Sequence, residues 1–373
     1  MRVPFNTPYF CGIEYRYITE ALENKQFSGD GLFTQKASSK LEQIFDAKKV
    51  LLTHSCTAAL EMCALLLEIT PGDEVIMPSF TFVSTANAFV LRGATPVFVD
   101  IDPLTQNIAI EAIECAISSK TRAIVVVHYA GISCDMEHLM KLANSYQIPV
   151  IEDAAQAIYS KYNGKPLGSF GDFATVSFHE TKNITCGEGG ALIINNSRFI
   201  ERAEIIREKG TNRSAFFRGD VDKYTWVDVG SSYLPGEVSA AFLFAQLQDG
   251  LEITKQRMEK WDTYYQYFSS LDTSLIGSPM HIPKFSSHNA HMFYLVCSSL
   301  SRRSDFIGHM RSCGIGCVFH YVPLHSAPAG RRFGKVSGRM DNTLRAGNCL
   351  VRFPMGPYVD TQYVIKAISK YIG

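Results

Sequence analysis

The sequence predicts an α/β fold, with a large, mostly parallel sheet carrying helices on both faces and a smaller C-terminal α+β domain. Two observations support this prediction. Between residues 49 and 194, short β-branched apolar runs alternate with helical patterns, which is typical of a parallel sheet with helical crossovers. These runs are apolar almost throughout, so each strand is expected to be buried on both faces.

The predicted elements of the large domain follow one another in a regular order. Two helices, near residues 17–22 and 36–45, flank a glycine-rich turn at 29–31. Strands are expected at residues 75–77, 96–99, 123–127, 150–151, 175–178 and 191–194. Helical patterns lie at residues 58–67, 84–91, 110–117, 136–146 and 201–209.

After residue 194 the sheet pattern fades. A long helical pattern runs from about residue 237 to 271, and it is followed by strands near 292–296 and 316–319 and helices near 304–312 and 360–372. A chain of 373 residues exceeds the usual size of one domain. We therefore expect a large domain over residues 1–245, N-terminal arm included, and a small domain over 246–373, joined by the long helix.

Composition excludes few classes of function. Lys+Arg and Asp+Glu balance at 36 each, so no net charge favours nucleic acid or a membrane surface. No signal peptide is expected, and no stretch approaches the roughly 18 to 20 apolar residues of a membrane span, which predicts a cytoplasmic protein. Ten cysteines suit a reducing compartment. No metal site is expected, because the close pair Cys313 and Cys317 lacks a second ligand pair.

Polar residues follow the carboxyl ends of the predicted strands, where α/β sheets bind ligands. Asp153 comes after the run at 150–151, and Lys182 comes after the run at 175–178. Residues 53–57 precede a helix and are rich in hydroxyl groups; a helix N-terminus offers unpaired amides to an anion. An acid, a lysine and an anion site are thus expected on one rim of the sheet.

This combination is what pyridoxal phosphate requires: an amine for an imine, an acid against the pyridine nitrogen and a phosphate cradle. A carboxylate beside that nitrogen favours its protonated form, which lets the ring accept electrons. Each element alone has a simpler explanation. A strand-terminal Asp can cap a turn, a lone Lys is usually a solvated surface charge, and a Ser/Thr run can cap a helix.

Six segments, at residues 78–85, 99–100, 128–131, 152–156, 177–183 and 187–190, carry a resemblance to a known family. They resemble the sugar-nucleotide aminotransferases, enzymes of pyridoxal-phosphate fold type I that make deoxyaminosugars for antibiotics and bacterial surface polysaccharides. The resemblance extends from Gly29 into the small domain. Segments at 207–214, 216–219, 221–226, 230–234, 289–294 and 319–321 are most similar to the transaminases that make dTDP-4-amino-4,6-dideoxygalactose for enterobacterial common antigen.

The resemblance implies a reaction in two halves. L-Glutamate would give its amino group to the cofactor, which would pass it to the C4 ketone of a dTDP-4-keto-6-deoxyhexose, with the galacto product favoured. The product would enter lipopolysaccharide O-antigen or common antigen synthesis. Alternatives are a C3-position or other sugar-nucleotide aminotransferase, a sugar dehydratase, or a non-catalytic sugar-nucleotide-binding regulator. Dehydratases have His in place of the lysine, and a regulator needs no such lysine, so Lys182 argues against both.

The resemblance also implies roles in binding the cofactor. Lys182 would form the imine and then shuttle a proton between substrate and cofactor. Asp153 would pair with the pyridine nitrogen, and Gln156 would hydrogen-bond near the ring hydroxyl. Phe82 and Ala155 would pack on opposite faces of the ring, although spacing alone predicts core packing for Phe82.

The phosphate would be held by Cys56, Thr57 and Ser177. The family usually has Gly at the position of Cys56, and Gly permits backbone conformations that Cys does not. His320 and Tyr321 are candidate substrate contacts. Neither His320 nor His128 is expected to act as an acid or base.

The resemblance implies a homodimer whose active sites are shared between subunits. Ser232 stands where many members have an Asn that reaches the partner's phosphate. Arg213 or Arg218 would bind the nucleotide pyrophosphate, because guanidinium groups suit bidentate phosphate contacts. Surface arginines without a function fit these two positions equally well.

Overall fold

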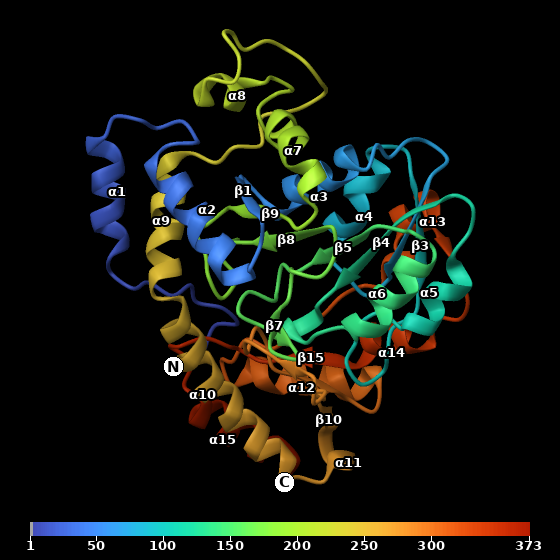
Figure 1. Cartoon of the computed structure of the whole chain (residues 1–373). Coiled ribbons are helices and arrows are strands. Elements are labelled where there is room, and N and C mark those ends of the chain that lie inside the picture. Colours follow the sequence, from blue (N-terminus) through green and yellow to red (C-terminus); the bar gives the residue numbers. More distant parts are fainter. Residues whose placement is uncertain (1–2) are drawn as a thin grey trace.

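The computed structural model describes residues 3–373. Its largest sheet has eight strands in the order β1-β9-β8-β5-β4-β2-β3-β14 (Figure 1). Neighbouring strands pair in parallel, except that β9 is antiparallel to both β1 and β8. The predicted, mostly parallel sheet is therefore confirmed. The strand bounds are β1 (Lys49–Thr53), β2 (Glu74–Pro78), β3 (Thr95–Val99), β4 (Thr121–Val127), β5 (Val150–Asp153), β8 (Phe173–Ser177), β9 (Gly190–Ile194) and β14 (Lys335–Val336).

Helices cover both faces of this sheet. One face packs against α3 (Cys56–Leu66), α4 (Val83–Val90) and α7 (Ile200–Arg207). The other packs against α1 (Glu14–Glu23), α2 (Leu32–Phe45) and α9 (Glu237–Gln248) at one end, and α5 (Ile110–Ala116) and α6 (Met136–Ser145) at the other. On β9, Leu192 joins the first core and Ile193 the second. Successive side chains thus enter opposite cores, which explains why the strands are apolar throughout.

The start of α2 is capped by a side chain from a distant helix. Its N-cap residue, Gly31, supplies no side-chain hydrogen bond. Instead, the buried Glu237 carboxylate of α9 accepts hydrogen bonds from the amides of Gly31 at 3.1 Å, Phe33 at 2.8 Å and Thr34 at 3.0 Å. A Cβ on Gly31 would lie 2.6 Å from the Glu237 carboxyl carbon, so glycine permits this approach. The carboxylate also suits the positive end of the helix dipole.

Replacing Glu237 by Gln is expected to lower the free energy of unfolding by roughly 2 to 4 kcal/mol, because buried amides lose a charged acceptor. Urea denaturation followed by circular dichroism measures this loss. The matched control is Glu259→Gln on an exposed position, which is expected to change stability by less than about 0.5 kcal/mol. Equal stabilities of the two variants would contradict the capping role of Glu237.

The small domain contains a four-stranded sheet in the order β10-β12-β15-β13. Its strands are β10 (Ser278–Pro279), β12 (Tyr294–Val296), β13 (Val318–Phe319) and β15 (Leu350–Arg352). Helices α10 (Gly250–Ser269), α12 (Leu300–Ser312), α14 (Asp341–Cys349) and α15 (Thr361–Ile372) contribute to one aromatic-rich core with it. The strands expected near 292–296 and 316–319 and the helices near 304–312 and 360–372 are confirmed.

The single long helix expected from about residue 237 to 271 is wrong. The structure has two helices there, α9 and α10, which meet at Asp249. Asp249 has φ −98° and ψ 4°, outside the helical region. Asp and Gly are both poor helix formers, so the Asp249-Gly250 pair is a natural place for the helix to break.

Two segments cross the expected division at residue 245. Val3 pairs with Ile315, and the short β14 from the C-terminal part pairs in parallel with β3 of the large sheet. The division at 245 stays a prediction.

The remaining elements are short. A three-stranded sheet joins β11 (Ser286–Ser287), β6 (Lys161–Tyr162) and β7 (Lys165–Pro166). The other helices are α8 (Arg213–Arg218), α11 (Thr273–Ile276), α13 (Pro328–Phe333), η1 (Tyr129–Gly131), η2 (Ser197–Phe199) and η3 (Leu324–Ser326). Over residues 3–373, every helix is too short or too polar to cross a lipid bilayer.

Candidate active site

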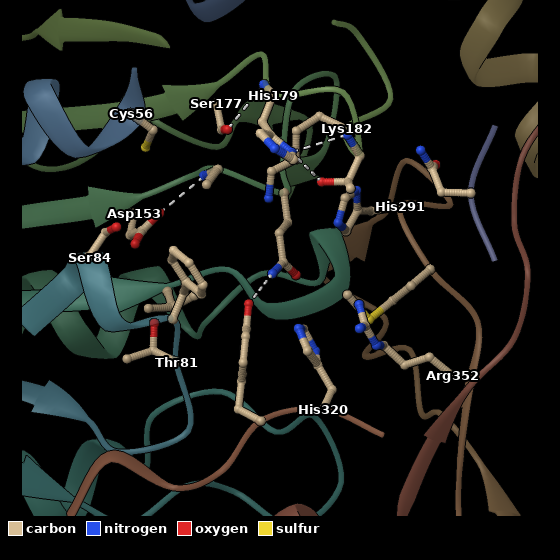
Figure 2. A pocket seen from close by; sticks show the side chains of 18 of the residues that line it. Cys56, Thr81, Ser84, Asp153, Ser177, His179, Lys182, His291, His320 and Arg352 are labelled. Carbon is tan, nitrogen blue, oxygen red and sulfur yellow. Dashed lines mark hydrogen bonds between the residues drawn. The ribbon is translucent and has the colours of Figure 1, made fainter. Parts of the chain in front are cut away.

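A cavity of about 860 Å³ is enclosed by residues at the carboxyl ends of β5 and β8, the N-terminus of α3 and the small domain. Figure 2 shows its polar side chains converging from these elements. Asp153, Ser177 and Lys182 line it from the large sheet, and His320 and Arg352 line it from the small domain. The acid, the lysine and the anion site that are predicted at one edge of the sheet therefore form one wall of the cavity.

Asp153 ends β5 and is 5% exposed. Its Oδ2 accepts a hydrogen bond from Thr85 Oγ1 at 2.8 Å, and its Oδ1 accepts one from the Ala155 amide at 3.2 Å. Burial raises the pKa of the Asp153 carboxyl, and within residues 3–373 it has no ion-pair partner. A buried carboxylate with only neutral donors is stabilised by a cation, so the residue fits a protonated pyridine nitrogen.

The neighbouring Glu152 faces away from the cavity and fixes the strand. Its carboxylate accepts hydrogen bonds from the amides of Gly168, Phe170 and Gly171 at 2.7–2.8 Å. It also lies 2.9 Å from His128 Nε2. The Nδ1 of His128 accepts a bond from the Cys134 amide at 3.3 Å, which assigns the proton to Nε2. His128 is thus a satisfied structural histidine, as the sequence suggested.

Lys182 lies in the turn after β8, and its side chain enters the cavity (Figure 2). Burial lowers the pKa of its amine, while Cys56 and Asp153 act in the opposite direction. Within residues 3–373, no hydrogen bond engages its Nζ. Asn183 anchors the turn by donating to the Asn289 carbonyl at 2.9 Å. An amine that is neutral at lower pH than an ordinary lysine is suited to bond a carbonyl carbon.

The N-terminus of α3 forms the anion site. Ser55 caps the helix by accepting from the Ala58 amide at 3.1 Å. The amides of Cys56 and Thr57 lie in the first turn, where a helix offers them no acceptor. Thr57 Oγ1 and Ser84 Oγ lie 2.7 Å apart at the cavity wall, and the Ser177 hydroxyl lies on the same wall. Two free amides and several hydroxyls fit a phosphate group.

Cys56 causes no backbone strain at the start of α3. It is the first residue of α3 and lies outside the positive-φ region that glycine would be needed for. The glycine that matters is Gly190 on β9, where a Cβ would lie 2.3 Å from the Cys56 nitrogen. Gly190 lets β9 pass directly against the anion site.

Phe82 and Ala155 both line the cavity, and Phe82 is 56% exposed to solvent. The Gln156 side chain is held between two partners. Its Oε1 accepts from the Ala130 amide at 2.7 Å, and its Nε2 donates to the Tyr321 hydroxyl at 3.2 Å. The seven predicted cofactor-binding residues other than Ser232 thus line the same cavity as Lys182; their roles stay predictions.

His320 and Tyr321 lie on the small-domain side of the cavity. Their ring centroids are 3.4 Å apart, and His320 Nδ1 lies 2.9 Å from the Tyr129 hydroxyl. Burial, with a contribution from the positive charge of Arg352, holds the pKa of His320 well below its ordinary value. His320 is therefore neutral and suited to hydrogen bonding rather than to gaining a proton.

Three predicted residues lie outside this cavity. Ser232 is exposed and forms a bridge with Glu208. Arg213 pairs with Glu208 at 2.8 Å, and Arg218 pairs with Glu204 at 2.7 Å. Ser232 is expected to reach the phosphate in a partner subunit's site, and Arg213 or Arg218 is expected to bind the nucleotide pyrophosphate; these roles stay predictions.

Several cavity residues are not singled out as site residues by the sequence analysis. Thr85 holds Asp153 but lies inside a helix, away from any strand end. Ser84, His291 and Arg257 also line the cavity, and Arg352 belongs to a three-residue strand too short to predict. Ligands of α/β sheets bind beyond the carboxyl ends of the strands, and this rule identifies only those cavity residues that follow strands of the large sheet.

Comparison with known proteins places these features among related chains. The model of the DegT/DnrJ/EryC1/StrS aminotransferase family matches residues 12–370. GDP-perosamine synthase of Escherichia coli O157:H7 is 33% identical, over 87% of this chain and 86% of that protein. UDP-4-amino-4-deoxy-L-arabinose–oxoglutarate aminotransferase of Shewanella sediminis is 32% identical, over 86% and 85%. The PMP form of a proposed sugar aminotransferase from Streptococcus pneumoniae superposes with a TM-score of 0.91 at 25% identity, over 100% and 97%.

Proposed function

The chain belongs to the DegT/DnrJ/EryC1/StrS aminotransferase family and is a pyridoxal-phosphate-dependent sugar aminotransferase; we propose that it aminates C4 of a dTDP-4-keto-6-deoxyhexose, with L-glutamate as donor. The favoured product is dTDP-4-amino-4,6-dideoxygalactose. We place this product in the synthesis of a surface polysaccharide on the basis of the sequence resemblance.

The observation that carries the proposal is the meeting of three groups in one cavity: the Lys182 amine, the buried Asp153 carboxylate and the anion site at the start of α3. When bound, pyridoxal phosphate supplies a carbonyl carbon that takes up an amino group and a ring that delocalises the electrons of a carbanion. The residues of the cavity supply the amine, the carboxylate and the anion site.

Each group has a separate task. Asp153 would hold a proton on the ring nitrogen, because its buried carboxylate pairs with no cation among residues 3–373. The amides of Cys56 and Thr57 hold the phosphate. The Lys182 Nζ would carry a proton from the substrate carbon to the cofactor in the donor half and in the reverse direction in the acceptor half, since burial lowers the pKa of the amine. Phe82 positions the ring and limits access of water.

The acceptor is inferred from relatives and from the room in the cavity. Two relatives are named for amino sugars on GDP and UDP carriers. A cavity of about 860 Å³ accommodates a cofactor and part of a second substrate. The dTDP carrier, the C4 position and the galacto configuration rest on the segments between residues 207 and 321 that resemble the dTDP-aminosugar branch.

We propose further that the enzyme acts as a homodimer with shared sites. Helix α8 and the loop after it project from the body of the chain (Figure 1). This arm exposes the large aromatic side chains Phe217, by 66%, and Trp226, by 78%, and we propose that a partner subunit covers them. Ser232, Arg213 and Arg218 lie on or beside it, so a partner that covered the arm would bring them near a second cavity.

The test is a proton NMR spectrum of the sugar product. Purified protein, pyridoxal phosphate, L-glutamate and dTDP-4-keto-6-deoxyglucose are expected to give dTDP-4-amino-4,6-dideoxygalactose, identified by a small H3–H4 coupling. A large coupling would assign the gluco isomer instead. No aminosugar from this substrate would contradict the proposed acceptor, even where glutamate still converts the bound cofactor.

A further inference from the structure

The imidazole of His291 lies on the cavity wall, and the backbone on both sides of it is held in place. The residue precedes β12 and lies beside the turn that carries Lys182 (Figure 2). Its amide donates to Asn289 Oδ1 at 3.0 Å, and its carbonyl accepts from Arg257 Nη2 at 2.7 Å. These two bonds keep the ring at the cavity.

A neighbouring side chain decides which nitrogen of the His291 ring carries the proton. The Nδ2 of Asn183 donates to the Asn289 carbonyl at 2.9 Å, so Asn183 Oδ1 is the atom that lies 3.0 Å from His291 Nδ1. An amide oxygen only accepts, so the proton is assigned to Nδ1. The Nε2 atom therefore keeps a free lone pair, and no hydrogen bond to residues 3–373 engages it.

The ring of His291 is neutral. Burial, together with nearby positive charges that include Lys182, holds the pKa of His291 well below its ordinary value. His291 thus presents to the cavity an acceptor atom without a charge. It differs in this from His128, both of whose ring nitrogens have protein partners.

The amine of Lys182 has few acceptors within the cavity. Among residues 3–373, the acids that line the cavity are Asp153 and Glu188. Asp153 is assigned to the ring nitrogen of the cofactor, and Glu188 is exposed and lies 3.7 Å from His179. An amine that takes up a proton becomes an ammonium with three N–H groups, and such a group is costly to bury without acceptors.

We propose that His291 is a positioning residue for Lys182, whose ammonium donates a hydrogen bond to His291 Nε2 while it carries the proton between substrate and cofactor. This inference rests on the proposed transamination. The proton leaves the substrate carbon, stays on Lys182 Nζ and goes on to the cofactor, while His291 keeps its own proton on Nδ1. Because Asn183 follows Lys182 directly, its bond to His291 fixes the ring relative to the lysine.

The donor half-reaction tests this role without the sugar. In His291→Leu, the single-turnover rate with saturating L-glutamate is expected to fall roughly 10- to 100-fold, the worth of a hydrogen bond to a charged group. The half-saturating glutamate concentration is expected to stay within about threefold, because the lost bond forms only during proton transfer. Glutamate deuterated at C2 is expected to slow the variant by at least the factor found for the unsubstituted enzyme.

His291→Gln is the conservative variant. Its amide oxygen can take a position near that of Nε2, so it is expected to recover part of the rate lost in His291→Leu. The matched control is His281→Gln, at an exposed position outside the cavity, which is expected to keep the full rate. Both His291 variants are expected to retain the visible absorbance of the bound cofactor, which shows that they fold.

A second readout needs neither cofactor nor turnover. Acetic anhydride reacts with neutral amines, and mass spectrometry of the peptide that contains Lys182 measures the rate in cofactor-free protein. An acceptor raises the pKa of an ammonium, so its removal in His291→Leu is expected to speed acetylation several-fold at about pH 7. Cys56, Asp153 and Arg352, whose charges also act on this amine, are the same in both proteins.

An unchanged donor rate in His291→Leu, a smaller isotope effect or an unchanged acetylation rate would overturn the assignment. A loss confined to the sugar half-reaction would also overturn it and would make His291 a contact of the sugar. Because the donor half uses no sugar, it tests His291 even if the dTDP sugar is the wrong acceptor. Failure of the proposed acceptor would appear only in the sugar half of the unsubstituted enzyme.

Discussion

Replacing Lys182 by Ala is expected to lower kcat by at least about 10⁴-fold, because the cavity would lose both its amine nucleophile and its proton carrier. Among residues 3–373, no other lysine lines the cavity to take over either task. Single-turnover mixing with L-glutamate, followed by absorbance, measures the chemical step directly. The protein is expected to fold, because Lys182 Nζ makes no hydrogen bond to any residue from 3 to 373.

A matched control is Lys284→Ala, at an exposed position outside the cavity. That variant is expected to keep its full rate. A Lys182→Ala enzyme that retained a tenth of the normal rate would show that the reaction does not depend on this amine, and the assignment of the site would be wrong.

Replacing Asp153 by Asn is expected to lower kcat by roughly 10²- to 10³-fold, the cost of removing one preorganised charge from a reacting centre. The side chain keeps its shape: its Oδ1 can still accept from the Ala155 amide, and its Nδ2 can donate to Thr85 Oγ1, which then accepts instead of donating. What is lost is the negative charge that favours a proton on the ring nitrogen. Stopped-flow rates of both half-reactions measure the effect, and both are expected to fall.

Thr85→Val separates charge from positioning. It removes the 2.8 Å hydrogen bond to Asp153 but leaves the carboxylate, so a loss of about tenfold or less is expected. If Asp153→Asn were no slower than Thr85→Val, the charge of Asp153 would have no special role in the reaction.

The strands and site residues of the large domain could be predicted, because each strand is a short contiguous run and the site residues follow the strands directly. Strands such as residues 123–127 and 191–194 are short apolar runs, and Asp153 and Lys182 follow strands directly. Parallel strands bring such residues to one edge whatever the details of packing. For the same reason, the cofactor wall of the cavity could be predicted from the sequence.

The small-domain wall could not be predicted, because its residues depend on tertiary packing. Arg352 lies on a strand of three residues, and its position facing Lys182 follows from the way two domains close on each other. The break at Asp249 was missed because apolar periodicity continues on both sides of it. The contact that is expected for Ser232 is with a second subunit, so the structure of one chain does not contain it.

The most direct test of the central claim, that this cavity attaches the cofactor at residue 182, is borohydride reduction of the pyridoxal-phosphate-loaded protein followed by peptide mass spectrometry. Reduction fixes the bond between an amine and the cofactor. The account predicts one phosphopyridoxyl group, on the peptide that contains Lys182, and none after prior treatment with excess L-glutamate. Modification of a different lysine, or none at all, would contradict it.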